Sequence, residues 1–253
     1  MKKVGMVFLV FLGLLVMVVL FKNLGQRRIL RQLVSADMAK IKELHYRLNM
    51  LGLIPVGEAV IFRERQEEYD GRKVYHLRAA AFSGKVISIF FSAKAEVDSF
   101  VSMDDLNPVM FKQKLFVKNK YDTEKEVYYD QKQGVMTLAG VSRIIPIGTK
   151  DPLSAMFFLR RMDAQAIKDF EFNINTNQKT YVLKGAAQIQ DESIDGKPCQ
   201  LIRLRADIRR RDKNPYHKSS IAMLLLRVSE NIPFKINVLA GGVYLEAVLI
   251  GVR

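Results

Sequence analysis

The stretch TKDPLSAMFFLRRM, residues 149–162, decides the fold that we predict for this chain. Asp151 is suited to cap a helix, and Pro152 then falls at the first helical position, where a missing backbone N–H is tolerated. The apolar side chains that follow surround the helix axis instead of forming one stripe: Leu153, Ala155, Met156, Phe157, Phe158, Leu159 and Met162. A helix that is apolar on most sides is buried on most sides. We therefore predict one short helix in the interior of the protein.

The sequence on both sides of this helix is typical of antiparallel β-structure. About a dozen segments alternate between apolar and polar residues or form short apolar runs, and turn residues separate them. Asp70-Gly71 and Gly241-Gly242 are suited to hairpin turns, because Asp and Gly tolerate positive φ. These features predict a mainly β fold. A large curved antiparallel sheet, an open or half barrel, is wrapped around the short central helix.

The first 21 residues predict a membrane anchor. Residues 4–21 form a run of 18 residues without a charged or polar side chain, and 14 of them are Val, Leu or Phe. As a helix this run spans about 27 Å, close to the roughly 30 Å of a bilayer core. We predict a transmembrane signal-anchor helix over 4–21, after a cytoplasmic tip at 1–3. A cleaved signal peptide is the alternative, although no small-x-small cleavage site follows the run.

Two further regions follow the anchor. A helical stalk over 22–41 is predicted by apolar residues at spacings of three and four: Leu30, Leu33, Val34, Met38 and Ile41. The stalk can lie along lipid head groups as an amphipathic helix, or it can act as a simple spacer. Residues 42–253 then form the β-rich domain.

Charge is distributed unevenly along the chain. The net charge is +14, from 40 basic and 26 acidic residues, and the first 31 residues hold six of the basic side chains and no acid. The remaining, moderately basic domain suits an anionic membrane surface and carries no nucleic-acid-binding signature. We therefore expect membrane lipids as partners and no nucleic acid. The candidate anion patch, for which a solvated strand end is the alternative, consists of Arg205, Arg209, Arg210, Arg211 and Lys213.

The sequence predicts no catalytic centre, metal site or cofactor. The single cysteine, Cys199, has no histidine near it in the sequence, and His45, His76 and His217 are scattered. Neither a glycine-rich phosphate loop nor a Gly-x-Ser-x-Gly nucleophile motif occurs. We therefore expect that the protein is not an enzyme.

The predicted central helix is the candidate ligand-binding or core element. Its candidate site residues are Asp151, Leu153, Met156, Phe157 and Arg160. Arg160 and Arg161 interrupt its apolar surface, and a buried arginine needs an acidic partner because an unpaired buried charge is unfavourable. One of the two arginines is expected to reach solvent. The other anchors the helix to the sheet or lies at a ligand head group.

Short motifs in a fixed order connect residues 42–252 with a known family. They are Tyr46, Gly52, Val56-Gly57-Glu58-Ala59, Tyr69, Gly71, Val74-Tyr75-x-Leu77, Asp104, Pro108, Lys150-Asp151-Pro152-Leu153-Ser154, Arg160, Pro233 and Gly241. In these residues the chain resembles the family of domain of unknown function 3108. The resemblance implies an exported bacterial envelope protein and brings no established activity. The implied curved sheet is similar in outline to that of periplasmic lipoprotein carriers, an analogy at the level of the fold.

The apolar helix, the predicted tether and the positive charge favour a membrane-anchored envelope domain of unknown activity that binds a lipid or other apolar ligand in its curved sheet. A packed core without a cavity is the alternative for the same fold. From the resemblance, we expect a single pass through the bacterial inner membrane, with the bulk of the chain in the periplasm or an equivalent outer space. The alternative function is a non-catalytic protein-interaction module of an envelope assembly, which uses the sheet edges or the basic patch.

Overall fold

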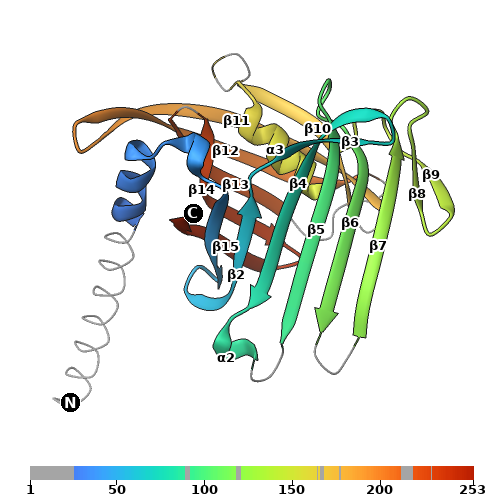
Figure 1. Cartoon of the computed structure of the whole chain (residues 1–253), viewed down its shortest axis with the longest axis horizontal. Helices are drawn as coiled ribbons and strands as arrows, with labels where there is room; N and C mark the ends of the chain where they lie inside the picture. The colour runs from blue at the N-terminus through green and yellow to red at the C-terminus, as the bar shows by residue number, and fades with distance from the viewer. Residues whose placement is uncertain are drawn as a thin grey trace.

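One β-sheet dominates the computed structural model, which describes residues 26–88, 92–117, 121–163, 165, 168–176, 178–211, 219–228 and 230–253 (Figure 1). Within these residues, 15 strands form the sheet, and all neighbouring strands in it are antiparallel. The strands are β1 (Glu43–Met50), β2 (Ile54–Phe62), β3 (Arg65–Tyr69), β4 (Arg72–Ser83), β5 (Ala93–Ser102), β6 (Pro108–Val117), β7 (Tyr121–Asp130), β8 (Val135–Leu138), β9 (Val141–Ile144), β10 (Asp169–Thr176), β11 (Lys179–Ile194), β12 (Lys197–Arg210), β13 (Ser219–Arg227), β14 (Asn231–Ala240) and β15 (Val243–Val252). The helical elements with defined bounds are the 3-10 helix η1 (Met38–Lys40), α2 (Lys85–Ser88) and α3 (Pro152–Arg161).

Neighbouring strands of the sheet are mostly neighbours in the chain. The spatial order is β10-β11-β12-β13-β14-β15-β1-β2-β4-β5-β6-β7-β8-β9, and β3 pairs with β4 beside this path. The last strand, β15, pairs with the first, β1, so the middle of the sheet forms where the two ends of the domain meet. The edges of the sheet are β9 and β10, which flank α3 in the sequence. The sheet is therefore open, as the sequence predicts.

The two hairpin turns expected from the sequence are present. Asp70 and Gly71 have φ values of 51° and 70° between β3 and β4, and Gly241 and Gly242 have φ values of 57° and 81° between β14 and β15. Positive φ is tolerated by Gly and, to a lesser degree, by Asp, because other side chains clash with the backbone there. Local sequence therefore fixes where these strands reverse.

The start of α3 is also set locally. The Asp151 carboxylate accepts hydrogen bonds from the backbone N–H groups of Leu153 and Ser154, at 2.8 Å and 3.0 Å. In return, the Asp151 N–H donates to Ser154 Oγ at 2.9 Å, which completes a capping box, and Pro152 lies in the first turn. The predicted cap is confirmed.

The position of α3 confirms that it is central. Leu153 and Phe157 pack with Leu77 of β4 and Val101 of β5 in one buried cluster. Leu159 and the C-cap residue Met162 join another cluster with residues of the opposite part of the sheet, namely Phe170, Leu183, Ala187, Ile202, Leu204, Ala206, Met223 and Leu225. The helix thus lies between the two parts of the curved sheet and packs against both (Figure 1). Each large apolar side chain buried in this way contributes about 1.5–3 kcal/mol.

The described part of the N-terminal region packs on the sheet. Residues 26–35 are helical, and their buried side chains Ile29 and Leu33 join a cluster that includes Leu226 and Ile232. Arg31 Nε lies 2.8 Å from the Asp195 carboxylate in the turn between β11 and β12. The apolar side of residues 26–35, which belong to the predicted stalk, therefore faces the β-rich domain.

The predicted transmembrane helix, 4–21, and the cytoplasmic tip, 1–3, lie outside the described residues. In the portion of the chain that the structure describes, no helix combines the length and the apolar character needed to cross a membrane.

Candidate functional site

A cavity of about 500 Å³ lies between the inner face of the sheet and the N-terminal half of α3. Its lining comes from β1, β2 and β4 to β8, from α3, from the end of β10 and from β14 and β15. The α3 residues in the lining are Pro152, Leu153 and Met156. Because the helix does not fill the whole concave side of the sheet, the interior is not a fully packed core.

Small side chains in matching register create this space. Ala81 of β4 lies opposite Ala59 of β2 on one side and Ala95 of β5 on the other. In the next row, Ala79 lies opposite Ile61. All five residues line the cavity. Side chains at alternate positions share one face of a strand, so three adjacent strands bring alanines together where larger side chains would fill the interior.

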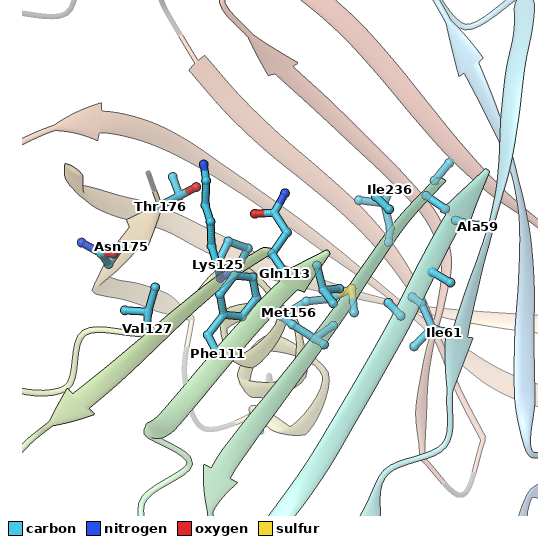
Figure 2. Close-up of a pocket in the computed structure, with 18 of the residues that line it drawn as sticks. Ala59, Ile61, Phe111, Gln113, Lys125, Val127, Met156, Asn175, Thr176 and Ile236 are labelled. Carbon is cyan, nitrogen blue, oxygen red and sulfur yellow. The ribbon is translucent and has the colours of Figure 1, made fainter. Parts of the chain in front are cut away.

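The cavity has a polar end and an apolar end. In Figure 2 the polar residues gather on one side of the view: Gln113, Lys125, Asn175 and Thr176. Gln113 and Lys125 are cross-strand partners on β6 and β7. The opposite end is apolar and includes Ala59, Ile61 and Ile236, with Met156 between the two ends. This separation of polar and apolar groups matches the two parts of an amphipathic molecule.

A second hollow, of about 530 Å³, lies between the two edges of the open sheet. One side is formed by Arg143 and Ile144 of β9, and the other by residues that include Lys179 at the start of β11. Asn175 and Gln178 line both this hollow and the cavity. The polar end of the cavity is therefore next to the gap between β9 and β10.

Asn175 has an unusual environment at this junction. Its side chain is 3% exposed, and its Nδ2 atom is buried without a hydrogen-bond acceptor among the described residues. A buried amide N–H group without an acceptor is unfavourable by about 1–3 kcal/mol. An oxygen-bearing ligand group at this position would satisfy it.

The chain matches the model of a known family. The model of the family described as "Protein of unknown function (DUF3108)" matches residues 43–242. The chain belongs to the DUF3108 family. The match covers strands β1 to β14 and α3, which supply nearly all of the cavity lining, and it ends directly before β15. The predicted family membership is confirmed.

A solved structure has a similar fold. It is the crystal structure of a β-barrel-like protein of domain of unknown function DUF1849 from Brucella abortus. The TM-score is 0.59 at 12% sequence identity, and the alignment covers 84% of this chain and 97% of that one. At this identity the likeness shows the fold alone. No curated protein matches the chain.

Part of the predicted helix site lines the cavity. Leu153 and Met156 line the cavity of this DUF3108 chain, whereas Phe157 is buried between α3 and the sheet. Asp151 is fully buried and caps α3. Ser99 Oγ of β5 donates a 2.7 Å hydrogen bond to the Asp151 carboxylate. Burial raises the pKa of this carboxyl group above its usual range.

The two arginines of α3 differ in exposure, as the sequence predicts. The side chain of Arg160 is 11% exposed, donates from Nε to the carbonyl oxygen of Asn231 at 3.2 Å and lies 3.5 Å from the Glu230 carboxylate. Arg161 is exposed, yet it lies over the Tyr75 ring and 3.1 Å from the Glu64 carboxylate. Both residues anchor the C-terminal turn of α3, and neither lines the cavity.

Lys150 is a buried lysine next to the cap. Burial lowers its pKa to about 8. Its Nζ atom donates to the carbonyl oxygen of Leu106 at 2.9 Å and to Asn107 Oδ1 at 3.0 Å, and it lies 4.6 Å from the centre of the Phe158 ring. Lys150 therefore fastens the loop before β6 to the start of α3.

The predicted anion patch is not a single surface. Arg205 and Arg209 are exposed on β12, where Arg209 lies 3.9 Å from the carboxylate of Asp207 between them. Arg210 points to the other face, because side chains alternate along a strand. Arg211 lines the hollow between the sheet edges and donates to Asn173 Oδ1 at 3.0 Å. Lys213 lies outside the described residues.

A larger hollow, of about 950 Å³, lies elsewhere and is polar. Both signs of charge line it, including Arg72, Asp105, Asp130 and Lys132. Asp105 accepts hydrogen bonds from the backbone and side chain of Asn107, and Asp130 accepts from the N–H group of Lys132. These carboxylates stabilise the turns to which they belong.

Across the residues that the structure describes, no group of three His, Cys, Asp or Glu side chains is placed to hold a metal ion. Cys199 is buried in an apolar cluster, and burial raises the pKa of its thiol. His45 lies 2.8 Å from the Glu43 carboxylate, and His217 is outside the described residues.

His76 joins three strands outside the cavity. Its Nε2 lies 2.9 Å from Asp98 of β5, its Nδ1 lies 3.2 Å from Glu67 of β3, and its ring stacks on Phe100. Arg78 Nε also lies 3.2 Å from Asp98. The hydrogen bond with Asp98 raises the pKa of His76 and lowers that of Asp98.

We expect replacement of His76 by Gln to remove a pH-dependent contribution to stability of about 1 kcal/mol or less, given solvent screening. His76 stabilises below its usual pKa of 6.5 and loses this contribution as pH rises through its raised folded pKa. Asp98 stabilises above its usual pKa of 3.8 and loses this contribution as pH falls through its lowered folded pKa. Urea denaturation should show the largest difference from the unmodified protein between about pH 4 and 6.5. A difference that grows above pH 8 would contradict this pairing.

Sequence reasoning did not single out the alanines, Gln113, Lys125 or Asn175. A signal was present, because Ala79-Ala80-Ala81 and Ala95 place small residues on strands that alternation assigns to the inner face. Small residues on an inward face indicate space. Asn175 and Lys125 have no such signal, because their meeting depends on how the two sheet edges approach each other.

Proposed function

We propose that this DUF3108 domain binds an apolar or amphipathic ligand in the cavity between its sheet and α3. The observation that carries the proposal is the matched row Ala59, Ala81 and Ala95, which leaves about 500 Å³ beside the helix. This volume lies within the roughly 300–1,000 Å³ of ligand pockets, and such pockets are mainly apolar with a few polar groups. Both properties describe this cavity.

Placement at a membrane fits the same function and is also a proposal. It rests on the sequence of residues 4–21, which has the length and apolar character of a membrane-spanning helix. A bacterial inner-membrane anchor, with the domain on the outer side, would give the cavity access to lipids.

The test is photoaffinity labelling of the full chain in lipid nanodiscs with a neutral, diazirine-bearing palmityl alcohol. Peptide mapping should find label on the segments that contain Ala59, Met156 and Ile236. An excess of unlabelled palmityl alcohol should remove this label. We expect Ala81→Phe to reduce it about tenfold, because the ring occupies the cavity, a loss of about 1.4 kcal/mol in binding free energy.

Ala186→Phe is the matched control. Ala186 is exposed on β11 opposite Arg205, so it adds the same side chain on the outside of the sheet. Its labelling should equal that of the unmodified chain, and both variants should keep the circular dichroism spectrum of the unmodified chain. Cavity peptides that stay unlabelled in the unmodified chain would contradict ligand binding.

A protein-interaction module is the second candidate, and the open sheet edge favours it. The edge strand β9 exposes Val141 by 58% and Ile144 by 91%, and Ile147 nearby is 71% exposed. An apolar edge strand can pair with a strand of another protein. The labelling experiment separates the two candidates, because a pure interaction module leaves the cavity peptides unlabelled.

A further inference from the structure

The charged side chains around the polar end of the cavity all carry the same sign. Lys125 lines the cavity, and Arg143, Lys179 and Arg211 line the adjoining hollow between β9 and β10. No carboxylate lines either space among the described residues. A concave surface lined by one sign of charge attracts a ligand of the opposite sign.

Three of these cations have no acidic partner among the residues that the structure describes. In the described part of the chain, no carboxylate lies within 4.0 Å of Lys125, Arg143 or Lys179. This contrasts with Lys112 on the neighbouring strand, which lies within ion-pair distance of both Glu124 and Glu126. These three exposed cations are therefore available to an external anion.

Hydrogen-bond donors lie in the same place. The buried Nδ2 atom of Asn175 has no acceptor among the described residues, and Asn175 lines both spaces. The amide of Gln113 and the hydroxyl of Thr176 lie at the same end of the cavity as Lys125 (Figure 2). Donors of this kind bind the oxygen atoms of a carboxylate or a phosphate.

We propose that the ligand is an anionic amphiphile. Its chain lies in the apolar end of the cavity among Ala59, Ile61 and Ile236, and its carboxylate or phosphate head group lies at Lys125 and Asn175, facing the gap between β9 and β10. This inference rests on the proposed ligand-binding function and adds the charge of the ligand and the direction in which it lies.

The test is competition against the same neutral photoprobe, with the full chain in nanodiscs of a zwitterionic lipid. The competitors share one chain length and differ in the head group: dodecanoate, dodecyl phosphate, dodecanol and dodecyltrimethylammonium. We expect at least one of the two anions to compete about tenfold better than dodecanol, and the cation to compete least. The comparison of dodecanoate with dodecyl phosphate identifies which anionic oxygen group the site prefers.

Lys125→Gln should abolish the preference for the anions and leave competition by dodecanol unchanged. Lys197→Gln is the matched control, since it removes the same charge from an exposed residue at the opposite end of β12 from Arg211. It should keep the preference. Equal competition by the anions and dodecanol, or a preference that survives Lys125→Gln, would overturn the head-group inference while ligand binding stands. Absence of competition by every compound would instead overturn ligand binding.

Discussion

Replacement of Asp151 by Ala is expected to destabilise the domain by roughly 3 kcal/mol. The change removes the acceptor for the N–H groups of Leu153 and Ser154 and leaves Ser99 Oγ without its buried partner. Loss of a helix cap accounts for about 1–2 kcal/mol, and buried donors without acceptors account for the rest. Because α3 joins the two parts of the sheet, the effect should reach the cavity as well. Urea denaturation followed by circular dichroism measures the loss.

Asp151→Asn is the matched control. Asn is also a good cap, and its side-chain oxygen can accept the same backbone hydrogen bonds. Burial raises the pKa of the Asp151 carboxyl group, so the stability that this shift contributes is fully present below its usual pKa of 3.8 and declines as pH rises through its raised folded pKa. Asp151→Asn should therefore match the unmodified protein at pH 7 and fall below it near pH 4. Equal stability of the Ala and Asn variants would show that the cap is unimportant.

Replacement of Gly57 by Ala is expected to lower the free energy of unfolding by about 2–3 kcal/mol. A Cβ atom on Gly57 would overlap the carbonyl oxygen of Phe82 on β4. The backbone has little room to move away, because Gly57 is paired with Ser83 on one side and with Leu48 of β1 on the other. The same pairing of β2 with β4 places Ala59 opposite Ala81, so the change should also weaken labelling of the cavity. Thermal or urea unfolding together with the photoprobe measures both effects.

Gly251→Ala provides the comparison. Gly251 lies on β15 with open space where a Cβ atom would be placed. Its substitution should change the free energy of unfolding by no more than about 0.5 kcal/mol. If Gly57→Ala is as stable as Gly251→Ala, then β2 and β4 do not approach as closely as the structure shows.

The family motifs acquire physical explanations from these contacts. Gly57 allows the close approach of β4, and Tyr46 donates a 2.7 Å hydrogen bond from its hydroxyl to the carbonyl oxygen of Pro233. Lys150 and Asp151 join the loop before β6, strand β5 and the start of α3. In the described residues the motifs thus assemble the scaffold around the cavity, and the head-group site proposed at Lys125 and Asn175 lies outside them.

Residues that are close together in the sequence predicted the helix and the two hairpin turns, because neighbouring residues determine these features. The cap at Asp151, the proline after it and the apolar residues that surround the axis identified a buried helix before any contact was known. Asp70-Gly71 and Gly241-Gly242 identified two chain reversals through the φ values that they tolerate. Alternation also separates Arg209 from Arg210 on β12, so the division of the predicted anion patch was within reach of the sequence.

The amino-acid sequence by itself determined a mainly β domain with one internal helix and a family assignment. Only the tertiary structure decided that the interior contains a cavity and that its polar end is positively charged. Strand register brings Ala59, Ala81 and Ala95 into one row, and the curvature of the sheet brings Lys125 and Asn175 to one end. Register and curvature arise from pairing between distant segments, which periodicity within a single segment does not specify.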